Sequence, residues 1–138
     1  MEYTPEALEI LNKLRDHVSA NAKAKGFKDP PSGIPFAVWF SRPLEIYRAA
    51  VYMINLVGEA AEFWEAARKG KLREPCDKAQ GMIDKGLPPL TCAEEELADM
   101  IIRCLDNAAE FEVDIAKAIA VKAAYNAGRA YQHGGKLA

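Results

Sequence analysis

Four acidic residues form two pairs with the same spacing. Glu59 and Glu62 lie in N-L-V-G-E-A-A-E-F-W-E-A-A-R, and Glu96 and Asp99 lie in E-L-A-D. Helical residues three apart share one face, so each pair presents two carboxylates to the same side. The first pair lies among apolar side chains, where a carboxylate without a partner is strongly destabilising. The pattern therefore indicates acids that need a cation.

Two helices that each offer two acids can surround a divalent cation with oxygen ligands. Mg²⁺ prefers such ligands and suits carboxylates combined with a phosphate substrate. A ferritin-type di-iron centre is not expected, because it needs Glu-x-x-His and neither His17 nor His133 has a Glu three residues before it. An acidic stripe can also be a solvated surface, but the pairing of two such stripes favours a magnesium site.

Basic residues of the opposite sign lie near the end of the chain. Lys122, Asn126 and Arg129 follow at i, i+4 and i+7 and continue an apolar helix face. The segment H-G-G-K adds His133 and Lys136 around two glycines, whose backbone can approach an anion closely. The alternative interpretation of the basic residues is that they only offset the negative end of the helix dipole, because cations are favoured near a helix C-terminus. Acidic and basic residues together indicate phosphoryl chemistry. The sequence lacks the G-x-x-x-x-G-K-[ST] motif, so a P-loop enzyme is not expected.

Helix signals place these side chains. Thr4 followed by Pro5, the Thr91–Glu94 capping box and Asp114 each predict a helix start. We expect four helices, over residues 5–24, 43–70, 91–111 and 114–131, and hence an all-α four-helix bundle. Residues 71–91 are expected to form a loop with one short helix. The second helix is apolar on nearly all sides, which predicts an oligomer.

Aromatic residues cluster around a segment that cannot be one helix. Residues 28–43 contain four prolines, and Phe27, Phe36, Trp39 and Phe40 lie in or beside them. Such a loop either packs back on the domain or forms a pocket for a flat ligand. Both readings are open for Trp39.

The bulk composition narrows the function. The chain has 138 residues, which suits a single domain over 1–138, and a net charge of −2, which does not suit a basic nucleic-acid binder. No apolar run is long enough to span a membrane, and the N-terminus lacks the pattern of a signal peptide. Three cysteines without C-x-x-C spacing indicate reduced thiols. We expect a cytoplasmic protein without a nucleic-acid or membrane partner.

Three segments in order resemble the MazG-like all-α nucleoside triphosphate pyrophosphohydrolases. They are G-E-A-A-E-F-W-E-A, E-E-E-L-A-D-M-I-I-R-C-L-D-N-A and K-A-A-Y-N-A-G-R-A-Y-Q-H-G-G-K. The resemblance implies Mg²⁺ bound by the two acid pairs, Lys122 and Asn126 at the phosphates with the H-G-G-K segment close by, and a homodimer or homotetramer. It also implies hydrolysis of an NTP or dNTP to the monophosphate and pyrophosphate. The gap between Glu62 and Glu96 is longer than usual for the family, which bears on substrate choice.

The expected function is therefore a Mg²⁺-dependent nucleotide pyrophosphohydrolase, with a house-cleaning role in the nucleotide pool as one option. Its expected catalytic residues are Glu59, Glu62, Glu96, Asp99 and Lys122. Arg129 would bind phosphate oxygens, while Trp39 and His17 would face the base. The proton acceptor is left open among the four acids, Glu65 and Glu95. Two alternatives stay open: a non-catalytic nucleotide- or protein-binding helical module, and a pyrophosphohydrolase of a phosphoribosylated nucleotide.

Overall fold

The computed structural model describes residues 4–129, and these residues contain helices and no β-strand. The elements are α1 (Pro5–Ala24), α2 (Phe36–Trp39), a 3₁₀ turn η1 (Arg42–Leu44), α3 (Glu45–Arg68), α4 (Ala79–Asp84), α5 (Cys92–Glu110) and α6 (Ile115–Ala127). The all-α class and the four long helices expected from the sequence are confirmed. The 28–43 segment adds α2 and η1, and the connection after α3 contains the short α4.

Local signals in the sequence fix where the long helices begin and end. The Thr4 and Asp114 side chains each accept a hydrogen bond from a backbone N–H in the first turn of α1 and α6. Thr91 and Glu94 form a reciprocal capping box at the start of α5. Gly26 and Gly70, which follow α1 and α3, have positive φ angles that glycine adopts without strain. Gly128 ends α6 before residue 131, the end expected from the sequence.

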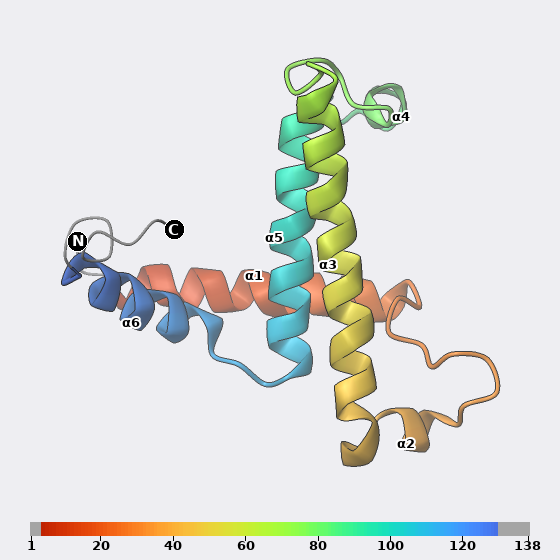
Figure 1. Cartoon of the computed structure of the whole chain (residues 1–138), viewed down its shortest axis with the longest axis vertical. Coiled ribbons are helices and arrows are strands. Elements are labelled where there is room, and N and C mark those ends of the chain that lie inside the picture. Colours follow the sequence, from red (N-terminus) through yellow and green to blue (C-terminus); the bar gives the residue numbers. More distant parts are fainter. Residues whose placement is uncertain (1–3, 130–138) are drawn as a thin grey trace.

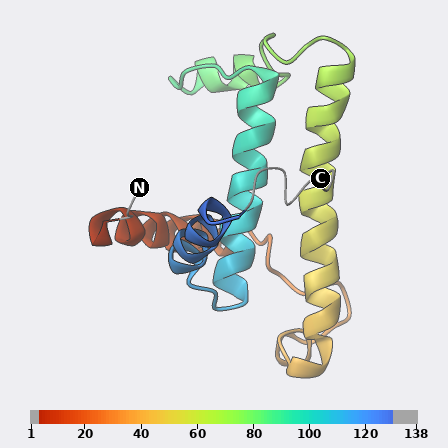
Figure 2. The same ribbon diagram turned by 60° about the vertical axis from the view of Figure 1, so that its left-hand side comes forward.

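The long helices form a column with a side limb (Figure 1). The neighbours α3 and α5 run antiparallel, and α1 crosses this pair at a steep angle and packs on α5. The last helix, α6, packs on α1 and lies away from α3, as the turned view also shows (Figure 2). Within residues 4–129 the long helices thus pack in pairs, α3 on α5, α5 on α1 and α1 on α6, rather than around one common core. Among residues 4–129, no helix combines the length and apolar character needed to cross a membrane.

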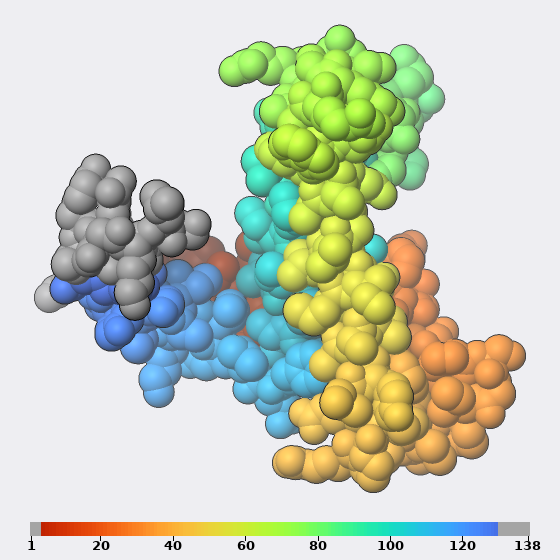
Figure 3. Space-filling view, viewed as in Figure 1, coloured from red at the N-terminus to blue at the C-terminus, as the bar shows by residue number. Residues whose placement is uncertain are grey.

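The face of α3 turned away from α5 is apolar and open. It lies uncovered along the front of the molecule from its N-terminal to its C-terminal end (Figure 3). Between 61% and 71% of the residue surface is exposed for Ile46, Tyr47, Ile54, Val57 and Trp64. Exposed apolar surfaces of this kind are typical of sites where proteins interact with other molecules.

A buried network of ion pairs holds the segment between α1 and α3 against the α3–α5 pair. The Lys28 ammonium lies 3.2 Å from carboxylate oxygens of Asp106 and of Glu110, and 4.7 Å from the centre of the Tyr52 ring. Arg48 donates to the backbone oxygens of Trp39 and Ser41, and its Nε lies 3.5 Å from Glu110. The lysine is only 4% exposed, so these ion pairs fix where the chain leaves α1.

Candidate metal and phosphate site

Three carboxylates meet between α3 and α5. Glu59 comes from α3, and Glu96 and Asp99 come from successive turns of α5. One oxygen from each lies within 4.8 Å of the others. The i, i+3 spacing turns the two α5 acids to one side, and the antiparallel packing brings Glu59 opposite them. We call these three residues the acid cluster.

Glu96 is the buried centre of the acid cluster. It is only 8% exposed, and its Oε2 has no hydrogen-bond partner within residues 4–129. Burial, reinforced by the charges of Glu62 and Glu95, raises the pKa of Glu96 to about 7. Burial and the charge of Glu59 likewise raise the pKa of Asp99. A buried oxygen without a donor, surrounded by negative charge, fits a hard cation such as Mg²⁺.

Glu62, the fourth predicted ligand, lies at the edge of the acid cluster. Its side chain is exposed, and its oxygens are not among those within 4.8 Å of one another. Its charge nevertheless contributes to the raised pKa of Glu96, so the two carboxylates are neighbours. The structure therefore groups three of the four predicted ligands closely and places the fourth beside them.

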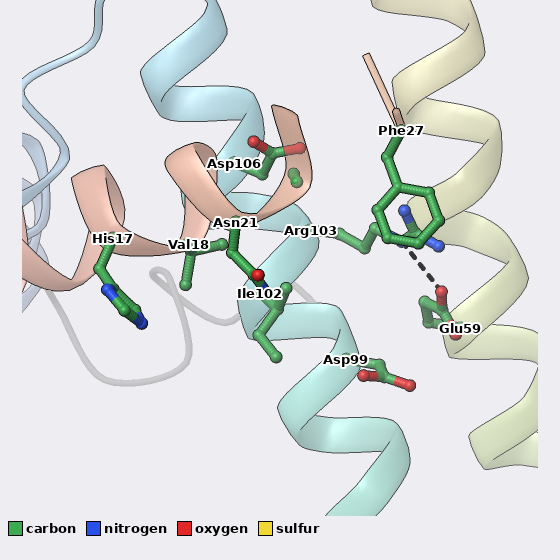
Figure 4. A pocket seen from close by; sticks show the side chains of 10 residues that line it. His17, Val18, Asn21, Phe27, Glu59, Asp99, Ile102, Arg103 and Asp106 are labelled. Atoms are coloured by element: carbon green, nitrogen blue, oxygen red, sulfur yellow. Dashed lines mark hydrogen bonds and ion pairs between the residues drawn. The ribbon is translucent and has the colours of Figure 1, made fainter. Parts of the chain in front are cut away.

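Beside the acid cluster is a cavity of about 400 Å³ between α1, α3 and α5 (Figure 4). Glu59, Asp99 and Arg103 line one side of it, and His17 and Asn21 of α1 line the other. Phe27 and the apolar Val18 and Ile102 complete the wall. The cavity combines ring and aliphatic surface with a few polar groups, the usual composition of a small-molecule site. His17, predicted to face a base, is thus brought to the same cavity as the acids.

The aromatic residue at this cavity is Phe27 and not Trp39. Trp39 is 5% exposed and does not line the cavity, and its backbone oxygen is held by Arg48. Phe27 is 69% exposed and directly precedes Lys28, whose buried ion pairs fix its position. The burial of Trp39 supports its interpretation as a packing residue. The exposed aromatic ring at the cavity is that of Phe27, in the turn that follows α1.

The predicted phosphate-binding residues of α6 lie elsewhere in the chain. Lys122 and Asn126 line a shallow hollow on α6 itself. The Lys122 ammonium lies 5.0 Å from the centre of the Tyr125 ring, and the Arg129 guanidinium carbon lies 5.9 Å from it. Because α6 packs on α1, one chain does not bring these side chains to the acid cluster. His133 and Lys136 lie outside the described residues.

Two acids considered as proton acceptors are already paired. Glu65 accepts hydrogen bonds from Arg68 and forms an ion pair with Lys69. The buried Glu95 carboxylate pairs with Lys78, and this hydrogen bond raises the pKa of Lys78. Both acids therefore already have a cationic partner in the structure.

Sequence reasoning did not find the role of the connection between α3 and α5. Backbone hydrogen bonds join Cys76 to Leu90 at 2.9 Å and Cys92 to Glu74 at 2.9 Å. This short antiparallel pairing holds Lys78 over the first turn of α5, next to the acid cluster. The mixed charges of the 71–91 segment gave no sign of it, because the pairing depends on residues far apart in the chain.

Arg103 is not among the site residues predicted from the sequence. In the structure its Nε donates to Glu59 Oε1 at 3.0 Å, across the gap between α5 and α3. Its position four residues after Asp99 was a usable signal, because i, i+4 residues share a helix face.

Comparison of the chain with protein-family models, curated proteins and solved structures found no match.

Proposed function

We propose that the protein is a Mg²⁺-dependent nucleoside triphosphate pyrophosphohydrolase. The observation that carries this proposal is the buried Glu96 oxygen without a donor, inside a three-carboxylate cluster that borders an aromatic-lined cavity. The resemblance of the sequence segments to MazG-like enzymes supports the same reaction. Paired acids alone would not, because acidic clusters also occur without a metal.

Glu59, Glu96 and Asp99 would hold the cation, with Glu62 completing the set from the edge. When bound, the cation neutralises the triphosphate and activates the attacking water. His17 and Asn21 would bind the base, because these side chains lie across the cavity from the acids, and Phe27, which also lines the cavity, would cover the ring of the base (Figure 4). Burial around Glu96 strengthens every electrostatic interaction made there.

The reaction follows from the charges that these residues present. A water oxygen forms a bond to the α-phosphorus, and the bond from that phosphorus to the bridging oxygen breaks. The electron pair leaves with pyrophosphate, and the proton of the water passes to a carboxylate of the cluster. Glu62 is the best placed acceptor, because it is exposed beside Glu96 and is not among the ion pairs of residues 4–129.

The functional unit in this proposal is a homodimer. Two copies that cover each other's exposed α3 face would combine two α3–α5 pairs into one four-helix bundle. Since α6 does not approach the acid cluster within one chain, a contribution of Lys122 to the site would have to come from the second copy. Light scattering at micromolar concentration should give at least twice the mass of one chain, and a monomer would contradict the dimer.

The reaction is tested with a panel of NTPs and dNTPs in Mg²⁺, scored by monophosphate and pyrophosphate formed in equal amounts. The Glu96→Gln variant is the inactive control. Release of nucleoside diphosphate and orthophosphate instead would show that the anhydride between the β- and γ-phosphates is cleaved, and would overturn the proposed bond. Binding of nucleotide without any product would assign the chain to the non-catalytic binding modules.

A further inference from the structure

Arg103 is a cationic side chain at the border between the acid cluster and the cavity. It lies on α5 one turn after Asp99 and lines the cavity together with Phe27 and His17 (Figure 4). Its Nε donates to Glu59 Oε1 at 3.0 Å. The Glu59 side chain is 13% exposed and that of Arg103 is 36% exposed, so the pair is half-shielded from water.

This contact uses only part of the donor capacity of Arg103. A guanidinium carries five N–H donors, and within residues 4–129 the two terminal nitrogens of Arg103 make no hydrogen bond. Arg48 provides the contrast in the same molecule. It is 7% exposed, and its Nη1 is held by two backbone oxygens while its Nε faces Glu110. Arg48 thus holds the fold together, whereas in the described part of the chain the terminal nitrogens of Arg103 stay available at the cavity.

We propose that Arg103 binds the phosphate chain of the substrate. Its Nε orients Glu59, and its two terminal nitrogens donate to non-bridging phosphate oxygens. The planar fork of an arginine matches phosphate oxygens in a way that a lysine ammonium cannot. Glu59 has two oxygens, so Arg103 can hold one while the other faces the cation.

This assignment rests on the proposed function and adds a cation that the chain supplies from its own site. Positive charge opposite the carboxylates is needed because a triphosphate would otherwise meet mainly negative groups. Lys122 and Asn126 do not reach the acid cluster within one chain. Arg103 is therefore the guanidinium that the fold itself places between the acids and the cavity.

The test uses inorganic tripolyphosphate, which isolates the phosphate chain from the unknown base. Binding is measured by titration calorimetry in Mg²⁺ for the full-length chain and the variants Arg103→Gln and Arg103→Lys. Arg42→Gln is the control, because Arg42 is exposed in η1, just before α3, and its loss removes the same charge. We expect Arg103→Gln to weaken binding by about ten- to a hundredfold, as for a lost charge-assisted hydrogen bond. Arg103→Lys should fall between wild type and Arg103→Gln, and Arg42→Gln should bind within about twofold of wild type.

A second measurement separates phosphate binding from a role in holding Glu59. The rise in melting temperature caused by Mg²⁺ alone should be retained in Arg103→Gln, because the cluster oxygens are intact. Loss of that rise would make Arg103 a support for the metal ligands and overturn the phosphate assignment. Unchanged tripolyphosphate binding in Arg103→Gln would overturn it as well.

The remaining outcomes also decide the question. Should Arg103→Gln not fold, Arg103→Lys replaces it, and wild-type affinity in that variant would contradict recognition by the fork. A wild-type protein that binds tripolyphosphate through Arg103 but hydrolyses no nucleotide would keep this inference and remove the proposed reaction. If wild type hydrolyses nucleotides and Arg103→Gln is equally active, the proposed reaction is kept and the role of Arg103 is removed.

Discussion

Glu96 combines burial with an ionisable group at one residue. Glu96 is a buried residue beside other acids, and one of its carboxylate oxygens has no hydrogen-bond donor within the described residues. In the folded protein it holds a proton more tightly than in the unfolded chain. Ionisation without a metal therefore destabilises the fold, and a bound cation would remove that penalty.

The stability of the metal-free protein should reveal this penalty through its pH dependence. The pKa of Glu96 rises from 4.5 to about 7, so its contribution to stability is fully present below pH 4.5 and is lost as the pH rises to about 7. The loss is at most about 3 kcal/mol. We expect Glu96→Gln in chelator to equal wild type near pH 4.5 and to exceed it at pH 8, measured by denaturant unfolding. A difference that does not vary with pH would contradict the buried, isolated carboxyl.

Glu62 should matter for activity more than for the fold. Because its side chain is exposed, Glu62→Gln should unfold within about 0.5 kcal/mol of wild type in chelator. Loss of a ligand or proton acceptor should lower kcat by about a hundredfold or more. The control is Glu9→Gln, an exposed acid paired with Lys13 on α1, which should keep full activity. Full activity of Glu62→Gln would remove Glu62 from the site.

At the scale of elements, caps and periodicity predicted α1, α3, α5 and α6 because these signals are local. The same signals could not predict which residue of the 27–40 segment faces the cavity. That choice depends on Lys28, which reaches Asp106 and Glu110 at the far end of α5. A lysine between an aromatic residue and prolines looks like a loop residue, and only its distant partners make it a core residue.

The Lys28 network should be essential to the packing of this segment. Lys28→Ala removes the ion-pair partner that Asp106 has within residues 4–129 and leaves Glu110 with Arg48 alone. We therefore expect a loss of about 3–5 kcal/mol in the free energy of unfolding. Lys25→Ala removes an exposed lysine from the same turn and should change stability by less than about 0.5 kcal/mol. Denaturant unfolding at one protein concentration compares the two. Similar small losses in both variants would mean that the network adds little.

At the scale of the whole molecule, the sequence predicted the types of residues in the site better than their arrangement. The acids and His17 come together because α1, α3 and α5 pack on one another. Lys122, Asn126 and Arg129 were expected in the same place, yet α6 packs along α1 and lies away from α3. A helical stripe shows which residues share a face, and it does not show which neighbour that face meets.

A mixed oligomer can test whether α6 acts on the acid cluster of a second copy. Glu96→Gln and Lys122→Ala should each be inactive alone. When they are co-refolded in equal amounts, half of the dimers are mixed, and each mixed dimer regains one intact site if the sites are shared between copies. Activity should then return to about a quarter of wild type, as for any symmetric dimer with shared sites. No recovery would place Lys122 outside the site or inside its own chain's site.

The open apolar face of α3 also has a consequence for how much protein the cell must make. If the second copy supplies the cover for that face, folding and association become one equilibrium, and mass action sets the folded fraction. Each tenfold dilution then removes about 1.4 kcal/mol from the stability of the dimer. A protein built this way has a threshold abundance, below which its chains are unfolded and open to proteolysis and above which they gain structure and activity together.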